Sequence, residues 1–169
     1  MRGCAVLFLT LYLLQAIVAE ANSAFSAAHV WLFAGALYVT YPALAAPLRE
    51  GLLVSVLGGL LCDAAAPVPF GTHAALFAAA HAVVYNARER LQRDETAVRV
   101  GVALVLNAAL YLAIASLRIR HVPAEATVWP RMLDDLAVSE LAVAACAPWF
   151  FALQARSLEL ARANPERSA

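Results

Sequence analysis

Residues 100–117 read VGVALVLNAALYLAIASL, and this stretch contains no Asp, Glu, Lys or Arg. A helix needs roughly 20 mostly apolar residues to cross the ~30 Å hydrocarbon core of a bilayer, so this stretch is close to the length of one span. Other stretches without charged residues are 3–19, 21–48, 51–62, 64–87 and 141–155. The sequence therefore predicts an all-α membrane protein that crosses the bilayer several times.

The composition agrees with that interpretation. Hydrophobic residues make up 63% of the chain and charged residues only 14%, whereas soluble domains average about 25% charged residues. With 169 residues, the spans occupy nearly everything: we expect one polytopic domain at 1–158, a polar cytoplasmic tail at 159–169, and no room for a soluble catalytic domain. The formal net charge is zero, which argues against a basic surface for nucleic acid.

Prolines mark the breaks between helices better than periodicity does, because a lipid-facing helix is apolar on most sides. Pro42 and Pro47 bracket the end of the second span, and Pro67 and Pro69 lie in the link between the third and the fourth. The third span is short, so we expect it to tilt or to be tucked among its neighbours. The prediction is a compact bundle of about six transmembrane helices, at 3–19, 28–47, 50–64, 71–88, 99–117 and 134–155.

Arginine placement predicts the orientation. Arg118, Arg120 and Arg131 lie on one side of the predicted membrane. Nine arginines lie at the alternate junctions, namely Arg2, Arg49, Arg88, Arg90, Arg93, Arg99, Arg156, Arg162 and Arg167. By the positive-inside rule, both termini are cytoplasmic, and we expect the chain in the bacterial inner membrane.

The first span allows a second interpretation. Arg2, the apolar run that follows it and the triplet Ala19-Glu20-Ala21 also fit a signal peptide with an A-x-A cleavage site. The next segment is another predicted span rather than a soluble domain to be exported, which favours an uncleaved first span.

Few polar side chains lie inside the predicted spans, and each is costly there unless it finds a partner. His81 and Asn107 fall at similar depths on consecutive antiparallel helices, so we predict a contact between them across that hairpin. A proton or substrate relay is the functional alternative, although no ladder of acids or histidines crosses the membrane.

A cluster of charges is predicted at the outer ends of spans five and six: Arg118, Arg120, Asp134, Asp135 and Glu140. Within it, Glu140 is expected to reach outward to the surface or to bind a partner.

Nothing in the sequence indicates catalysis. The three cysteines, Cys4, Cys62 and Cys146, form no C-x-x-C pair and indicate neither a disulfide framework nor a zinc site. The chain also lacks the H-E-x-x-H, G-x-S-x-G and Walker patterns. We therefore expect no catalytic residue, no metal and no cofactor, and the chain is interpreted as a non-enzyme.

The most distinctive stretch is 58–76, GGLLCDAAAPVPFGTHAAL, which predicts a helix end, a tight outer turn and a new helix. Gly59 removes side-chain bulk, so that another backbone can approach closely. Asp63 is expected to end its span with a charge at the surface. Gly71 permits a turn conformation, and Thr72 is expected to cap the incoming helix by accepting from a free backbone N–H.

This stretch resembles the rod shape-determining protein MreD family, which carries a G-x-x-x-D segment, a short turn, an L-G pair and a later leucine. The matching residues are Gly59, Asp63, Gly71 and Leu76, with Phe70 in place of the usual leucine. The six-span layout extends a looser resemblance over the rest of the chain. The resemblance implies a non-catalytic member of the bacterial wall-elongation complex. Its partner would be an MreC-like single-pass protein and, through it, an MreB-like filament and the wall-synthesis enzymes.

Two other classes stay open. The layout is also similar to the substrate-binding membrane subunits of energy-coupling-factor vitamin transporters. Those subunits usually show an A-x-x-x-A pattern in their first helix, which 3–19 lacks, and they need polar residues in an outward pocket. The outer links here offer only Asn22, Ser23, Thr72 and His73. The other class is a membrane anchor without specific chemistry.

Overall fold

The computed structural model describes residues 2–91, 95–119 and 128–163, and these residues form helices, turns and irregular segments without a β-strand. The elements in chain order are α1 (Arg2–Phe25), η1 (Ser26–Ala28), η2 (Gly35–Tyr38), α2 (Thr40–Ala45), α3 (Leu48–Ala65), α4 (Thr72–Ala87), α5 (Thr96–Ile119) and α6 (Val128–Ala163), where η denotes a 3-10 helix. The all-helical part of the fold prediction is therefore correct.

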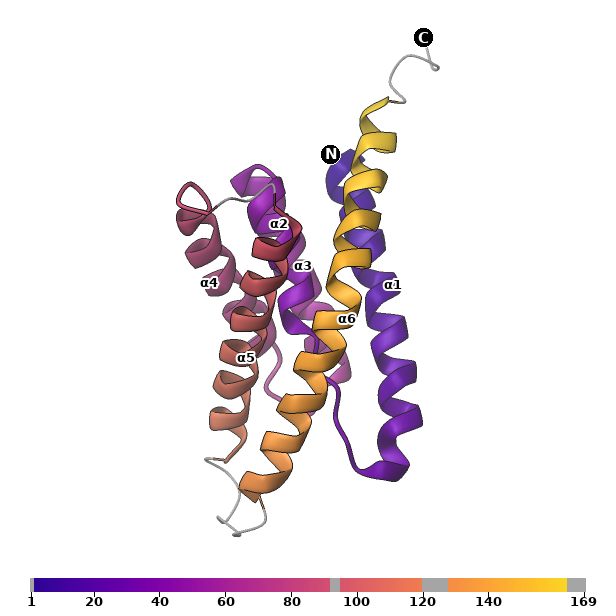
Figure 1. The fold of residues 1–169 in the computed structure, drawn as a ribbon, viewed down its shortest axis with the longest axis vertical. Coiled ribbons are helices and arrows are strands. Elements are labelled where there is room, and N and C mark those ends of the chain that lie inside the picture. The colour runs from indigo at the N-terminus through magenta and orange to yellow at the C-terminus, as the bar shows by residue number, and fades with distance from the viewer. Residues whose placement is uncertain (1, 92–94, 120–127, 164–169) are drawn as a thin grey trace.

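The chain runs back and forth between the two ends of an elongated bundle (Figure 1). The start of α1 and the end of α6 lie at the same end, which we call the terminal end, together with α2, the end of α4 and the start of α5. The opposite end, which we call the far end, carries the turn after α1, the turn between α3 and α4, and the start of α6. In the orientation that the arginines predict, the far end faces outward.

In the described part of the chain, three helices are long and apolar enough to cross a membrane, over Gly3–Phe25, Thr96–Arg118 and Trp129–Ala161. They contain the predicted spans 3–19, 99–117 and 134–155, and α6 extends beyond its prediction at both ends. The predicted spans 50–64 and 71–88 correspond to α3, with 18 residues, and α4, with 16. These two helices are shorter than the other three. Of all pairs of elements in the described part of the chain, α3 and α4 pack against each other most extensively.

The prediction of a single helix over 28–47 is wrong. After α1 the chain passes through η1, turns at His29 in the left-handed region (φ 56°), and follows an irregular path before η2 and α2 begin. Every residue from 33 to 44 is buried. A charge-free run looks the same in sequence whether lipid or protein surrounds it, and here protein does. We call 29–38 the broken segment.

Burial of the broken segment organises the core. Leu7 and Leu11 of α1, Phe77 of α4 and Phe151 of α6 are almost wholly buried around Tyr38 and its neighbours. Gly59 of α3 faces the start of α4 so closely that an added Cβ would lie 2.5 Å from Ala74 Cα. The packing of α3 on α4 therefore requires a residue without a side chain at this position, which is the role expected for Gly59 from the sequence.

Candidate functional site

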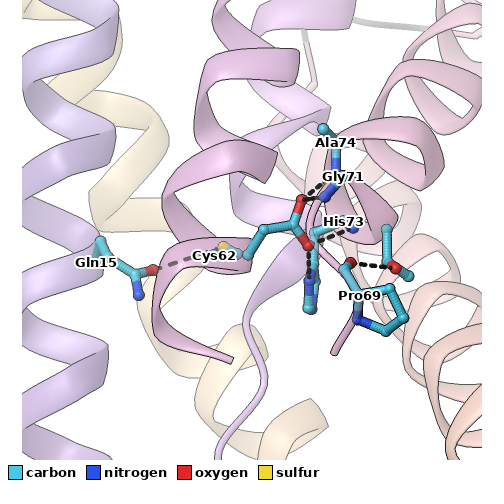
Figure 2. A network of polar contacts seen from close by, with 8 residues as sticks. Gln15, Cys62, Pro69, Gly71, His73 and Ala74 are labelled. Atoms are coloured by element: carbon cyan, nitrogen blue, oxygen red, sulfur yellow. Dashed lines mark hydrogen bonds and ion pairs between the residues drawn. The ribbon is translucent and has the colours of Figure 1, made fainter. Parts of the chain in front are cut away.

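The turn between α3 and α4 is held by one carboxylate. Asp63, near the end of α3, accepts hydrogen bonds from the backbone N–H groups of Gly71 (3.0 Å), His73 (2.8 Å) and Ala74 (3.2 Å). Its Oδ1 also lies 2.8 Å from His73 Nδ1 (Figure 2). The first N–H groups of a helix have no partner within that helix and carry partial positive charge, so an anion there satisfies them. Asp63 thus caps α4 from the neighbouring helix.

Other motif residues play related parts. The expectation that Asp63 sits at the surface is wrong, because its side chain is fully buried. Gly71 has φ +97°, the left-handed conformation that its expected role in the turn requires. Thr72 does not cap α4 as expected, since its hydroxyl donates to the Pro69 carbonyl at 2.6 Å. Leu76 is half-buried and packs against the core.

The broken segment is held differently, by side chains from three helices. Asn22 of α1 accepts from the Leu32 N–H (2.7 Å) and donates to the Leu32 carbonyl (3.0 Å). On α6, Asp135 accepts from the Trp31 N–H at 2.9 Å and Ser139 accepts from the Phe33 N–H at 2.9 Å. Unpaired backbone groups are costly in a buried segment, and these contacts replace the helical hydrogen bonds that the segment lacks.

Asn107 of α5 completes the set. Its Oδ1 accepts from the Ala36 N–H at 3.3 Å, and its Nδ2 donates to the Phe33 carbonyl and to Glu140 Oε1, both at 3.1 Å. Glu140 therefore accepts a hydrogen bond from Asn107 inside the bundle, and this contact differs from the expected outward reach to the surface. Binding of a partner protein by Glu140 stays a prediction. Neither the role of Asn107 nor those of Ser139 and Asn22 follows from sequence spacing, because their partners are 10 to 108 residues away.

The predicted contact between His81 and Asn107 is wrong. Both side chains are fully buried, but His81 Nδ1 bonds to Ser55 Oγ at 2.9 Å, and its Nε2 has no hydrogen-bond partner within the described ranges. Asn107 is occupied by the broken segment. The two residues lie on consecutive helices, yet the broken segment contacts α5 and takes up the polar atoms of Asn107.

The predicted charge cluster is brought together only in part. Asp135 binds the Trp31 backbone, while the Arg118 guanidinium carbon lies 6.0 Å from the centre of the Trp31 ring. Asp134 is exposed, and Arg120 lies outside the described residues. Within the described ranges, the structure has no ion pair between Arg118 and either aspartate. The two helix ends therefore meet through Trp31.

A cavity of about 550 Å³ lies in the far half of the bundle, and the sequence did not predict its extent. Residues at the ends of α1, α3 and α5 and at the starts of α4 and α6 surround it, and the broken segment supplies its inner wall. Four aromatic residues line it: Trp31, Phe33, Tyr38 and Tyr111. Its polar and charged lining residues are Gln15, Asn22, Ser23, His73, Arg118 and Asp135. Three of the four polar residues considered for an outward pocket, Asn22, Ser23 and His73, are therefore here.

Besides hydrogen-bond donors and acceptors, the lining of this cavity holds one guanidinium, one carboxylate and one thiol, those of Arg118, Asp135 and Cys62. Cys62 contributes a thiol that donates to Gln15 Oε1 at 3.6 Å. Among the described residues, no group of three or more His, Cys, Asp or Glu side chains is arranged to hold a metal ion. The Ser55–His81 pair has nucleophile-and-base geometry, but both residues are fully buried and neither lines the cavity.

None of the protein-family models, curated proteins or solved structures compared with this chain matches it.

Proposed function

We propose that this chain is a non-catalytic integral membrane component of the bacterial cell-wall elongation complex, resembling MreD. In this proposal it lies in the inner membrane as a six-span bundle with both termini in the cytoplasm. It supports rod-shape determination through lateral contacts with an MreC-like single-pass protein. That partner links it to an MreB-like filament and to the wall-synthesis enzymes.

The observation that carries the proposal is the joint action of the motif residues. Gly59 brings α3 against the start of α4, Asp63 caps α4, and Gly71 makes the turn between them. Three of the four residues on which the resemblance depends thus act together in one turn, and this supports the proposal. Because this unit faces inward, its role is to build the fold, and partner contact falls to other surfaces.

Exposed apolar faces offer those surfaces. Leu9 on α1, Val83 on α4, Val105 on α5 and Leu141 on α6 are all at least 66% exposed. Lipid covers such faces by default, and a single-pass helix can replace lipid along one of them through close packing.

In-cell photocrosslinking tests the proposal. A photoreactive amino acid placed singly at Leu9, Val83, Val105 or Leu141 should capture one single-pass protein from one face, and depletion of the chain should make rod-shaped cells round. The buried Leu11 is the matched control, which should crosslink only within the chain. Cells that keep their shape, with no protein captured at any of the four positions, would overturn this proposal.

The cavity favours a second candidate, a substrate-binding subunit of an energy-coupling-factor-type vitamin transporter. Its volume lies within the roughly 300–1,000 Å³ of small-molecule sites. This candidate predicts that the chain co-purifies with a membrane-embedded energising partner and an ATPase, and that cells lacking it need more of one vitamin. Capture of a single-pass partner together with loss of shape would decide for the first proposal.

A further inference from the structure

Two lining residues of the cavity, the half-buried Gln15 and the buried His73, have polar atoms without a partner among the described residues. Gln15 Oε1 accepts from the Tyr38 hydroxyl and the Cys62 thiol, whereas its amide nitrogen has no partner in the described part of the chain. His73 is 4% exposed, and its Nδ1 is paired with Asp63. In the neutral imidazole, Nδ1 carries the proton that points to Asp63, and Nε2 is left as an acceptor without a partner among the described residues.

One lining cation is also unpaired. The Arg118 guanidinium, near the end of α5, has no carboxylate partner within the described ranges and lies near the Trp31 ring. Asp135, the acidic residue of the lining, accepts from the Trp31 N–H through Oδ1. The guanidinium fork binds carboxylate, sulfonate or phosphate oxygens in pairs, so it supplies a site for an anionic group at the far end of the cavity.

Between these groups the walls are aromatic and aliphatic. Phe33 packs 6.0 Å from Tyr111 and 6.4 Å from His73, measured between ring centres. Rings prefer offset or tilted contact with other rings, so this lining suits a flat ring system. A hydrocarbon chain would fill the same space but would bury the free atoms of Gln15 and His73 without partners, which is unfavourable.

We infer that the cavity binds a small ring-containing anion, which donates an N–H or O–H to His73 Nε2, accepts from the Gln15 amide and places its acidic group on Arg118. This inference goes beyond the proposed role in wall elongation and does not depend on it. It assigns the far end of the bundle a ligand of defined chemistry, whatever protein contacts the outer faces.

The first test uses indole-3-acetate, which has a flat ring, an N–H donor and a carboxylate. The full chain in lipid nanodiscs should bind it saturably in equilibrium dialysis, and empty nanodiscs should not. Benzofuran-3-acetate replaces the N–H by oxygen and should bind about tenfold more weakly, because His73 Nε2 then loses its donor. Equal binding of the two compounds would overturn the assignment of His73, and no saturable binding of either would overturn the inference.

Matched variants place the site. Arg118→Gln should weaken binding about tenfold through loss of a charge-assisted contact, whereas Arg131→Gln, at an exposed position outside the lining, should not. Ala19→Phe puts a ring into the lining and should abolish binding, while Ala16→Phe, exposed on the same helix and outside the lining, should leave it unchanged. Equal effects within either pair, or tighter binding of hexadecanoate than of indole-3-acetate, would contradict the inference. Since these assays use the purified chain, their outcome is independent of the crosslinking result.

Discussion

The α3–α4 turn and the broken segment solve the same problem in opposite ways. Both must satisfy backbone groups where no regular helix does so. In the turn, Asp63 alone binds three N–H groups that lie 8 to 11 residues along the chain. In the broken segment, Asn22, Asn107, Asp135 and Ser139 share the work, and three of these lie more than 70 residues from their partners.

The difference shows how local and distributed contacts affect robustness. A charge at a helix N-terminus gains from the aligned peptide dipoles as well as from its hydrogen bonds, so one residue can do the work of several. Neutral amides and hydroxyls contribute less each, but the loss of one leaves the others in place. We therefore expect a single substitution in the turn to cause a large loss in the free energy of unfolding. In the broken segment, each substitution should cause a smaller loss. Unfolding of purified chain in mixed detergent micelles measures each prediction below.

The largest effect is expected for Asp63→Ala. It removes the acceptor of three backbone N–H groups and of His73 Nδ1. Each buried donor left unpaired costs about 1–3 kcal/mol, so the free energy of unfolding should fall by at least about 3 kcal/mol. Asp134→Ala is the control: Asp134 is exposed, and such changes stay within about 0.5 kcal/mol. If the two variants unfold alike, Asp63 is not the cap of α4.

Gly59→Ala comes next. The new methyl group would meet Ala74 backbone at 2.5 Å, so α3 and α4 must separate, at a cost of about 1–3 kcal/mol. Gly101→Ala, in open space on α5, should instead stabilise the protein by up to about 1 kcal/mol through helix propensity. If the free energy of unfolding falls for Gly59→Ala and rises for Gly101→Ala, the difference indicates close packing at residue 59. A stabilising Gly59→Ala would contradict it.

In the broken segment, Asn107→Leu is expected to have the largest effect. It leaves the Ala36 N–H and the Phe33 carbonyl unpaired in the core and should cost about 1–3 kcal/mol. Asn86→Leu, at an exposed position on α4, serves as the control and should be nearly neutral. If Asn107→Leu lowered the free energy of unfolding as much as Asp63→Ala does, Asn107 alone, and not several side chains together, would stabilise the broken segment.

Ser139→Ala should have the smallest effect, about 1 kcal/mol, because it removes one neutral acceptor from the Phe33 N–H. Ser116→Ala, whose hydroxyl is exposed and bonds within its own helix, is the control. Since Ser139 and Asn107 both hold Phe33, the double variant should show a coupling of about 0.5–3 kcal/mol. Strict additivity would argue that the two contacts act independently.

The elements foreseen from sequence are those whose signal is local. The all-helical class, the position of the α3–α4 turn and the need for glycine at residues 59 and 71 follow from charge-free runs and turn residues read in order. The partners of Asn107 and His81 did not follow, because comparable depth on two helices does not fix which faces meet. The single helix predicted for 28–47 failed for a related reason: hydropathy reports transfer out of water and not whether lipid or protein replaces the water.

By itself, the sequence determined that this chain buries long apolar stretches as helices, because runs without charge cannot stay in water and their backbone must bond internally. Only the tertiary structure decided that one of those runs would be unwound in the centre, held by amides, a hydroxyl and a carboxylate from distant helices. It also decided that a cavity with unpaired polar atoms would remain beside that run. Such contacts depend on the relative rotation of packed helices, which no local pattern of residues specifies.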